Sequence, residues 1–196
     1  MNLPNKISVV RICMIPVFIL FFYLEAVPYN RVIAAVIFAA AALTDMLDGH
    51  IARSRGLVTN LGKFLDPIAD KVLVATAFIL ALTAENIFGL FGTWCYIAGV
   101  VCICVILARE LIISAFRQIA AASGIVLAAE KLGKYKTTFQ DVCIFFLLLS
   151  ADFSGTAGKV LNVIGLVLFA VAVVLTVWSG VSYVLKNRQV LADTER

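Results

Sequence analysis

The sequence predicts an all-α, polytopic integral membrane protein with about six transmembrane helices. Hydrophobic residues make up 63% of the chain and charged residues only 14%, whereas soluble domains are closer to about half apolar and a quarter charged. The mean hydropathy is +1.05. Each transmembrane helix needs roughly 20 residues, so a chain of 196 residues has little length left for a soluble domain. A single membrane domain over residues 1–196 is the simplest organisation.

The first predicted helix begins near Asn2-Leu3-Pro4-Asn5, because asparagine caps helices and proline is tolerated in a first turn. The apolar stretch that follows is long, and residues 21–25 do not form the small-residue cleavage site of a signal peptide. We therefore expect a retained helix. The residues Gly124 to Lys136 form a polar break between the fourth and fifth apolar runs. The six apolar runs are 7–27, 30–48, 67–84, 93–118, 137–152 and 160–186.

The positions of the cations predict the topology. With six spans, all but two of the cations near these spans fall on one side, and only Arg31 and Lys159 lie opposite. Basic loops favour the cytoplasm, so we expect a multi-pass protein of the cell (cytoplasmic) membrane with both termini in the cytosol. Because the cations follow the ends of the spans, a nucleic-acid partner is not expected. The cations on the expected cytoplasmic side are Lys6, Arg11, Arg53, Arg55, Lys63, Lys71, Arg109, Arg117, Lys131, Lys134, Lys136, Lys186, Arg188 and Arg196.

Four aspartates form the main candidate site. Asp45, Asp48, Asp66 and Asp70 fall in the pattern D-x2-D-G-x2-A-R-x8-G-x3-D-x3-D. On helices, residues three or four apart share one face, so each pair of aspartates can act together. Acidic groups near a bilayer cost energy and mark substrate or ion sites, and oxygen ligands without His or Cys favour Mg²⁺ or Mn²⁺. The pattern predicts a metal site that works on phosphate groups.

A second candidate site is basic. Arg109 and Arg117 are eight residues apart and therefore share roughly one helix face, with Glu110 available to orient either one. Guanidinium groups suit a phosphate monoester. Lys134 and Lys136 follow in the polar break, where each lysine also has the ordinary role of setting topology. We expect the lysines to contribute less than the arginines, as flexible ammonium groups at a wet cavity mouth.

The aspartate pattern resembles the signature of the CDP-alcohol phosphatidyltransferases, integral membrane enzymes of phospholipid synthesis. Every fixed position of that signature is present. Within this family, further segments resemble the bacterial phosphatidylglycerophosphate synthases. These segments are Asn2-Leu3-Pro4-Asn5, Arg11, Asp66-Pro67-Ile68-Ala69-Asp70-Lys71, Arg109-Glu110 and Gly133-Lys134-Tyr135-Lys136-Thr137.

The resemblance implies a homodimer of six-helix domains, each with an active-site cavity open to the cytosol. It also implies transfer of a phosphatidyl group from CDP-diacylglycerol to glycerol 3-phosphate, with CMP released. Two divalent cations, Mg²⁺ or Mn²⁺, are implied, with Asp45 and Asp66 touching both, Asp48 favouring one and Asp70 the other. Asp70 is also the implied general base. The residues implied to hold CDP-diacylglycerol are Asn5, Gly49, Arg53 and Thr59, and the basic pocket for glycerol 3-phosphate would be Arg109, Arg117, Lys134 and Lys136.

Two alternatives remain open from the sequence. A related enzyme could use another acceptor, such as phosphatidylglycerol in a cardiolipin synthase, serine or inositol phosphate, and these acceptors differ in how many cations they need. A divalent-cation transporter would use the same aspartates for ion passage. A transport path requires polar groups deep in the membrane, whereas the polar residues of this chain gather at one face.

Overall fold

A computed structural model describes the backbone of residues 3–55, 60–122, 125, 127 and 131–192. Within these ranges, the side chains of residues 3–7, 45–55, 60–67, 122, 131 and 191–192 lie outside the description. The described residues form helices and connecting turns without a β-strand. The predicted all-α class is therefore confirmed for this part of the chain.

Each predicted apolar run lies largely within one long helix. The helices are α1 (Leu3–Tyr23), α2 (Asn30–Arg55), α3 (Asn60–Thr83), α4 (Glu85–Phe88), the short 3₁₀ helix η1 (Gly89–Phe91), α5 (Thr93–Ala122), α6 (Lys131–Ser150), α7 (Gly155–Lys186) and α8 (Gln189–Ala192). The predicted polar break was wrong in its second half, because α6 already begins at Lys131. Basic side chains do not prevent helix formation, so charge alone misplaced this boundary.

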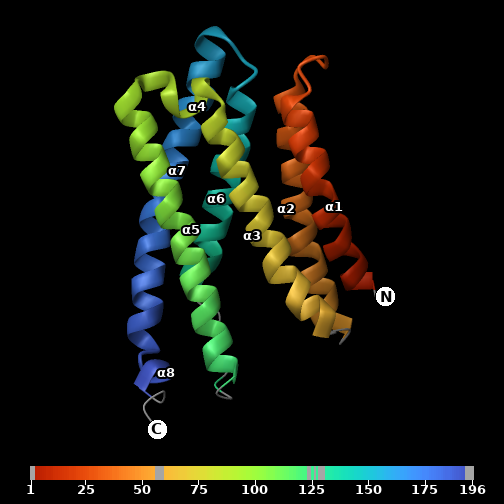
Figure 1. Ribbon diagram of the computed structural model, residues 1–196, viewed down its shortest axis with the longest axis vertical. Coiled ribbons are helices and arrows are strands. Elements are labelled where there is room, and N and C mark those ends of the chain that lie inside the picture. The colour runs from red at the N-terminus through yellow and green to blue at the C-terminus, as the bar shows by residue number, and fades with distance from the viewer. Residues whose placement is uncertain (1–2, 56–59, 123–124, 126, 128–130, 193–196) are drawn as a thin grey trace.

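The long helices run alternately up and down (Figure 1). As a result, the start of α1, the end of α2, the start of α3, the end of α5, the start of α6 and α8 all lie towards the lower end of the view. Arg31 and Lys159 begin α2 and α7 and therefore lie at the opposite end. The alternation thus brings the helix segments that carry most of the cations towards one end of the molecule.

Two features hold the helix ends in place. At the upper end, the apolar residues Ile68–Thr83 of α3 and the segment Glu85–Phe91 form a pair bent by 75°. Gly92 has φ +97°, and its N–H donates to the Gly89 carbonyl, which ends η1 before α5 begins. At the start of α2, Asp152 accepts a hydrogen bond from the Val32 N–H at 2.9 Å. This carboxylate from the α6–α7 turn satisfies one of the otherwise free N–H groups of the helix start.

The apolar core joins the helices that carry the candidate site. Phe78 of α3 packs edge-on against Phe169 of α7, with ring centroids 5.7 Å apart. Closer to the aspartates, Arg11 of α1 is fully buried and its Nε donates to the Ala41 carbonyl of α2 at 3.3 Å. This bond ties α1 to α2 one helical turn before Asp45. The packing therefore fixes the backbone on which the aspartates lie.

Two helices, Thr93–Ala121 and Gly155–Lys186, are long and apolar enough to cross a membrane, and the bent pair makes a third if it forms one span. The described parts of α1 and α2, Ser8–Tyr23 and Asn30–Thr44, are shorter apolar helices. The protein therefore has helices able to span a membrane.

Candidate active site

The aspartate pattern lies on two helices joined by a short connection. Asp45 and Asp48 lie in the second half of α2, and Asp66 and Asp70 in the first half of α3. Residues 56–59 connect the two helices, which also contact each other. Each pair of aspartates is thus on continuous helix at a spacing that gives both members one face. The helical backbone that the pattern requires is present on both sides of the connection.

Several predicted residues lie outside the description. They include the side chains of five residues and two further positions, Gly49 and Thr59, and Thr59 belongs to the undescribed connection 56–59. The five side chains are those of Asn5, Asp45, Asp48, Arg53 and Asp66. Among the described residues, no group of three or more His, Cys, Asp or Glu is close enough to hold a metal ion. The donor set itself fits the predicted group, because four carboxylates on two adjoining helix segments are the hard oxygen ligands that Mg²⁺ and Mn²⁺ prefer.

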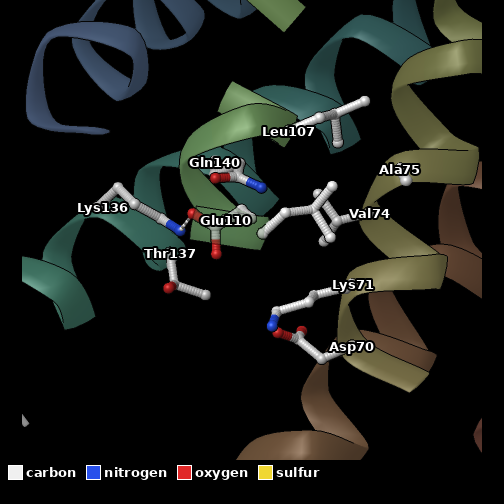
Figure 2. A pocket seen from close by; sticks show the side chains of 10 residues that line it. Asp70, Lys71, Val74, Ala75, Leu107, Glu110, Lys136, Thr137 and Gln140 are labelled. Carbon is white, nitrogen blue, oxygen red and sulfur yellow. Dashed lines mark hydrogen bonds and ion pairs between the residues drawn. The ribbon is translucent and has the colours of Figure 1, made fainter. Parts of the chain in front are cut away.

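Asp70 is the one signature aspartate whose side chain is described, and it lines a cavity of about 140 Å³ between α3, α5 and α6 (Figure 2). The cavity has two levels, one helical turn apart along α3 and α6. The charged level contains Asp70, Lys71, Glu110, Leu111, Lys136 and Thr137. The second level contains Val74, Ala75, Leu107 and Gln140.

Glu110 organises the charged level. Its Oε1 accepts a hydrogen bond from Lys136 Nζ at 2.5 Å and another from Arg109 Nη1 at 3.0 Å. The three side chains are 19%, 4% and 16% exposed, respectively. One carboxylate oxygen therefore holds a cation from its own helix and a cation from α6 at the cavity wall. In a partly buried site such charge-assisted bonds are stronger than neutral ones.

Both arginines of α5 face α7. Arg109 Nη2 donates to Ser179 Oγ at 2.9 Å, and Arg117 Nε donates to Tyr183 Oη at 3.1 Å. The prediction that the two arginines share one helix face is therefore confirmed. Gly180 leaves room for this packing, since a Cβ there would lie 3.0 Å from Cγ of Arg109.

The structure separates the four predicted basic residues. Lys136 lines the cavity, and it is buried with only 3% of its surface exposed. The expectation that it is a flexible ammonium at a wet mouth was wrong, because α6 begins early enough to carry it inward. Lys134 is exposed, whereas Arg109 and Arg117 stand behind the cavity wall against α7.

Sequence reasoning assigned three polar residues of the cavity, Lys71, Thr137 and Gln140, to no site. Lys71 directly follows Asp70 on α3, and it interacts electrostatically with Glu110, Asp70, Arg117 and Lys136. Gln140 lies four residues after Lys136 on the same face of α6. Helical spacing from the predicted residues would have found Gln140, whereas Lys71 was noted only as a cation of the expected cytoplasmic side and as part of the segment Asp66–Lys71.

Comparison with known proteins agrees with the geometry. The model of the family described as CDP-alcohol phosphatidyltransferase matches residues 1–178. Proteins named CDP-diacylglycerol–glycerol-3-phosphate 3-phosphatidyltransferase from Bacillus subtilis and Shigella flexneri serotype 5b are both 38% identical to this chain. The alignments cover 97% of both chains for the first and 98% of both for the second. The Rickettsia typhi protein of the same name is 36% identical over 93% of this chain and 94% of its own length.

The matching region includes the complete aspartate signature, both arginines of α5 and every residue that lines the cavity. Family membership is therefore supported over the two helices that carry the aspartates and over the three that enclose the cavity. The chain belongs to the CDP-alcohol phosphatidyltransferase family.

Proposed function

We propose that this protein transfers the phosphatidyl group of CDP-diacylglycerol to sn-glycerol 3-phosphate, giving phosphatidylglycerophosphate and CMP. The observation that carries the proposal is the cavity, in which Asp70 of the family signature and the Lys136–Glu110 pair lie together. The part of the cavity near Asp70 suits the diphosphate substrate, and the part near Lys136 suits a phosphorylated acceptor. The printed name shared by the nearly full-length relatives is that of an enzyme with these two substrates.

The charges around the cavity favour an acceptor with a phosphate. Lys71 and Lys136 line the cavity, and Arg109 forms an ion pair with Glu110, which also lines it. Asp70 and Glu110 are the carboxylates that line it among the described residues. A phosphate dianion would balance the excess of cations, whereas serine or phosphatidylglycerol would leave it largely unpaired. Lys71 thus joins Arg109, Arg117, Lys134 and Lys136 in the proposed acceptor site.

The proposed reaction is a single displacement at phosphorus. The primary hydroxyl of glycerol 3-phosphate attacks the β-phosphorus, the bond from that phosphorus to the CMP oxygen breaks, and CMP leaves. The Asp70 carboxylate is proposed to accept the hydroxyl proton, because it lines the cavity in which the acceptor would lie. Lys71 and Lys136 would hold the acceptor phosphate and so orient its hydroxyl.

Asp45, Asp48, Asp66 and Asp70 are the residues that would hold two divalent cations, with Asp45 and Asp66 shared between them. Bound there, Mg²⁺ or Mn²⁺ would neutralise the diphosphate and stabilise charge on the oxygens of the transfer. Asn5, Gly49, Arg53 and Thr59 are proposed to hold the CDP group. Most of the cations belong to helix segments that lie towards the lower end of Figure 1, which supports cytoplasmic termini and a cavity open to the cytosol. The homodimer belongs to the proposal on the strength of the family resemblance.

The direct test offers the purified protein CDP-diacylglycerol with one acceptor at a time and follows CMP release. The panel contains glycerol 3-phosphate, phosphatidylglycerol, serine and inositol phosphate. We expect glycerol 3-phosphate to give the highest kcat/KM. Preference for any other member would refute the proposed acceptor and leave the family assignment intact.

Arg53→Ala and Thr59→Ala are expected to raise the KM for CDP-diacylglycerol and to leave the KM for glycerol 3-phosphate nearly unchanged. Both residues match positions that hold the CDP group in the family. Loss of a charge-assisted bond costs about 1.5–3 kcal/mol, so the Arg53 variant should lose roughly tenfold or more in kcat/KM for the liponucleotide. The opposite pattern, with only the acceptor KM raised, would show that the two pockets are wrongly assigned.

Arg109→Ala and Arg117→Ala are expected to lower kcat/KM for glycerol 3-phosphate by roughly tenfold. Both guanidinium groups are already bonded to α7, so they act on the cavity mainly through its charge and through Glu110. Steady-state kinetics with each substrate varied in turn would measure this. Undiminished turnover of glycerol 3-phosphate by both variants would exclude the arginines from the acceptor site.

A further inference from the structure

Gln140 is the polar side chain of the second level of the cavity. Its neighbours there are Val74, Ala75 and Leu107, which offer no side-chain hydrogen bond. Gln140 is 2% exposed, so water reaches it only by way of the cavity. An amide in such surroundings is costly unless it is hydrogen-bonded.

The amide oxygen of Gln140 is unsatisfied within the described part of the chain. Its Oε1 is buried and has no hydrogen-bond partner there. Most buried polar side-chain atoms in proteins are paired, and exceptions call for a functional explanation. Gln140 lines the same cavity as Lys71 and Lys136.

We propose that Gln140 determines acceptor specificity by hydrogen-bonding the secondary hydroxyl of the acceptor. This inference rests on the proposed function and assigns a residue to a part of the substrate that the cations do not recognise. An amide can both donate to a hydroxyl and accept from it. The phosphate pairs with ammonium groups at the charged level, and the glycerol hydroxyl satisfies the amide at the next level.

The spacing along α6 supports this division. Lys136 and Gln140 are four residues apart, so they share one face, and their Cβ atoms are about 5–6 Å apart. In glycerol 3-phosphate, only a few bonds separate the phosphate from the secondary hydroxyl. The distance between these two groups is therefore comparable to the distance between the two side chains. A molecule whose phosphate lies at Lys136 therefore brings this hydroxyl near the amide, while its primary hydroxyl remains free to approach Asp70.

The experiment compares glycerol 3-phosphate with 3-hydroxypropyl phosphate, which has the same phosphate and primary hydroxyl but lacks the secondary hydroxyl. Both are offered to the full-length protein in detergent at saturating CDP-diacylglycerol. We expect wild-type protein to favour glycerol 3-phosphate by about tenfold or more in kcat/KM, because the analogue leaves a buried amide unpaired. In Gln140→Met, which keeps the volume of the side chain, this preference should fall to roughly one.

A matched control is Gln118→Met, which removes an exposed amide from α5 outside the cavity and should retain the wild-type preference. The KM for CDP-diacylglycerol should stay unchanged in Gln140→Met, and a rise confined to that KM would show that the amide contacts the lipid substrate instead. If Gln140 had a merely structural role, the variant would have a lower kcat/KM for both acceptors and an unchanged ratio between them. That result would also overturn the inference. These readings require Gln140→Met to elute as a monodisperse species.

The wild-type ratio can refute the inference even if the variant does not fold. Equal use of the two acceptors by wild-type protein would refute the role of Gln140 while leaving the proposed function in place. Failure of wild-type protein to use glycerol 3-phosphate, together with activity towards another acceptor of the panel, would refute both.

Discussion

Asp45→Asn and Asp66→Asn are each expected to abolish CMP release. Each substitution removes a charge from a carboxylate that the family resemblance gives to both cations, at nearly constant side-chain volume. Residues that only support metal ligands typically cost 10–100-fold when mutated, so loss of a shared ligand should exceed about 100-fold. Turnover is measured at saturating Mg²⁺ and again at saturating Mn²⁺, with both substrates in excess.

A suitable control is Glu85→Gln, which removes an exposed carboxylate from α4 at the opposite end of the bundle. It should keep wild-type turnover. The aspartate variants should elute from a size-exclusion column as the wild type does, because asparagine nearly keeps the volume of aspartate. Appreciable turnover by either variant with both metals would contradict the shared-ligand assignment.

Lys136→Met is expected to lower kcat/KM for glycerol 3-phosphate by about 30-fold or more. Removing one partner of a buried charged pair costs about 2–5 kcal/mol, and Lys136 is both bonded to Glu110 and exposed to the cavity. The substitution leaves Glu110 with Arg109 alone and takes one cation from the proposed phosphate site. Kinetics with varied glycerol 3-phosphate would measure the loss, and the KM for CDP-diacylglycerol should change little.

Two further lysines calibrate this effect. Lys134→Met, two residues earlier on α6 but exposed, should cost only about threefold, as a screened surface charge does. Lys159→Met, exposed at the start of α7 and far from the cavity, should cost nothing. Equal losses for Lys134 and Lys136 would mean that general surface charge, and not the buried pair, attracts the acceptor.

The sequence could predict the helices because their cause is local. Apolar runs separated by turns specify which segments are helical, and every predicted run lies largely within one long helix. Helical periodicity also sufficed to place Arg109 and Arg117 on one face of α5, and both side chains donate hydrogen bonds to α7. The beginning of α6 was misjudged because a charged stretch can be either a loop or the first turns of a helix. The family assignment rested on the aspartate spacing, which is likewise a local pattern, and the comparisons confirm it.

The contents of the cavity could not be predicted, because they depend on which helices are neighbours. Glu110 of α5 was expected to pair with an arginine of its own helix, and it does bind Arg109, but Lys136 of α6 shares the same oxygen. Nothing in the spacing of 26 residues between Glu110 and Lys136 indicates this contact. The sequence also could not predict that Lys136 is buried and Lys134 exposed. A charged side chain is buried only where a neighbouring helix supplies its partner.

The sequence by itself determined the all-α class, the apolar helices and the chemistry available at each position, because periodicity and residue type act within a few residues. Only the tertiary structure decided that α3, α5 and α6 enclose one cavity, that Lys136 is buried in it while Lys134 is not, and that Lys71 and Gln140 line its wall. Long-range packing brings these residues together, and packing depends on the combined shape of many side chains that no single segment encodes.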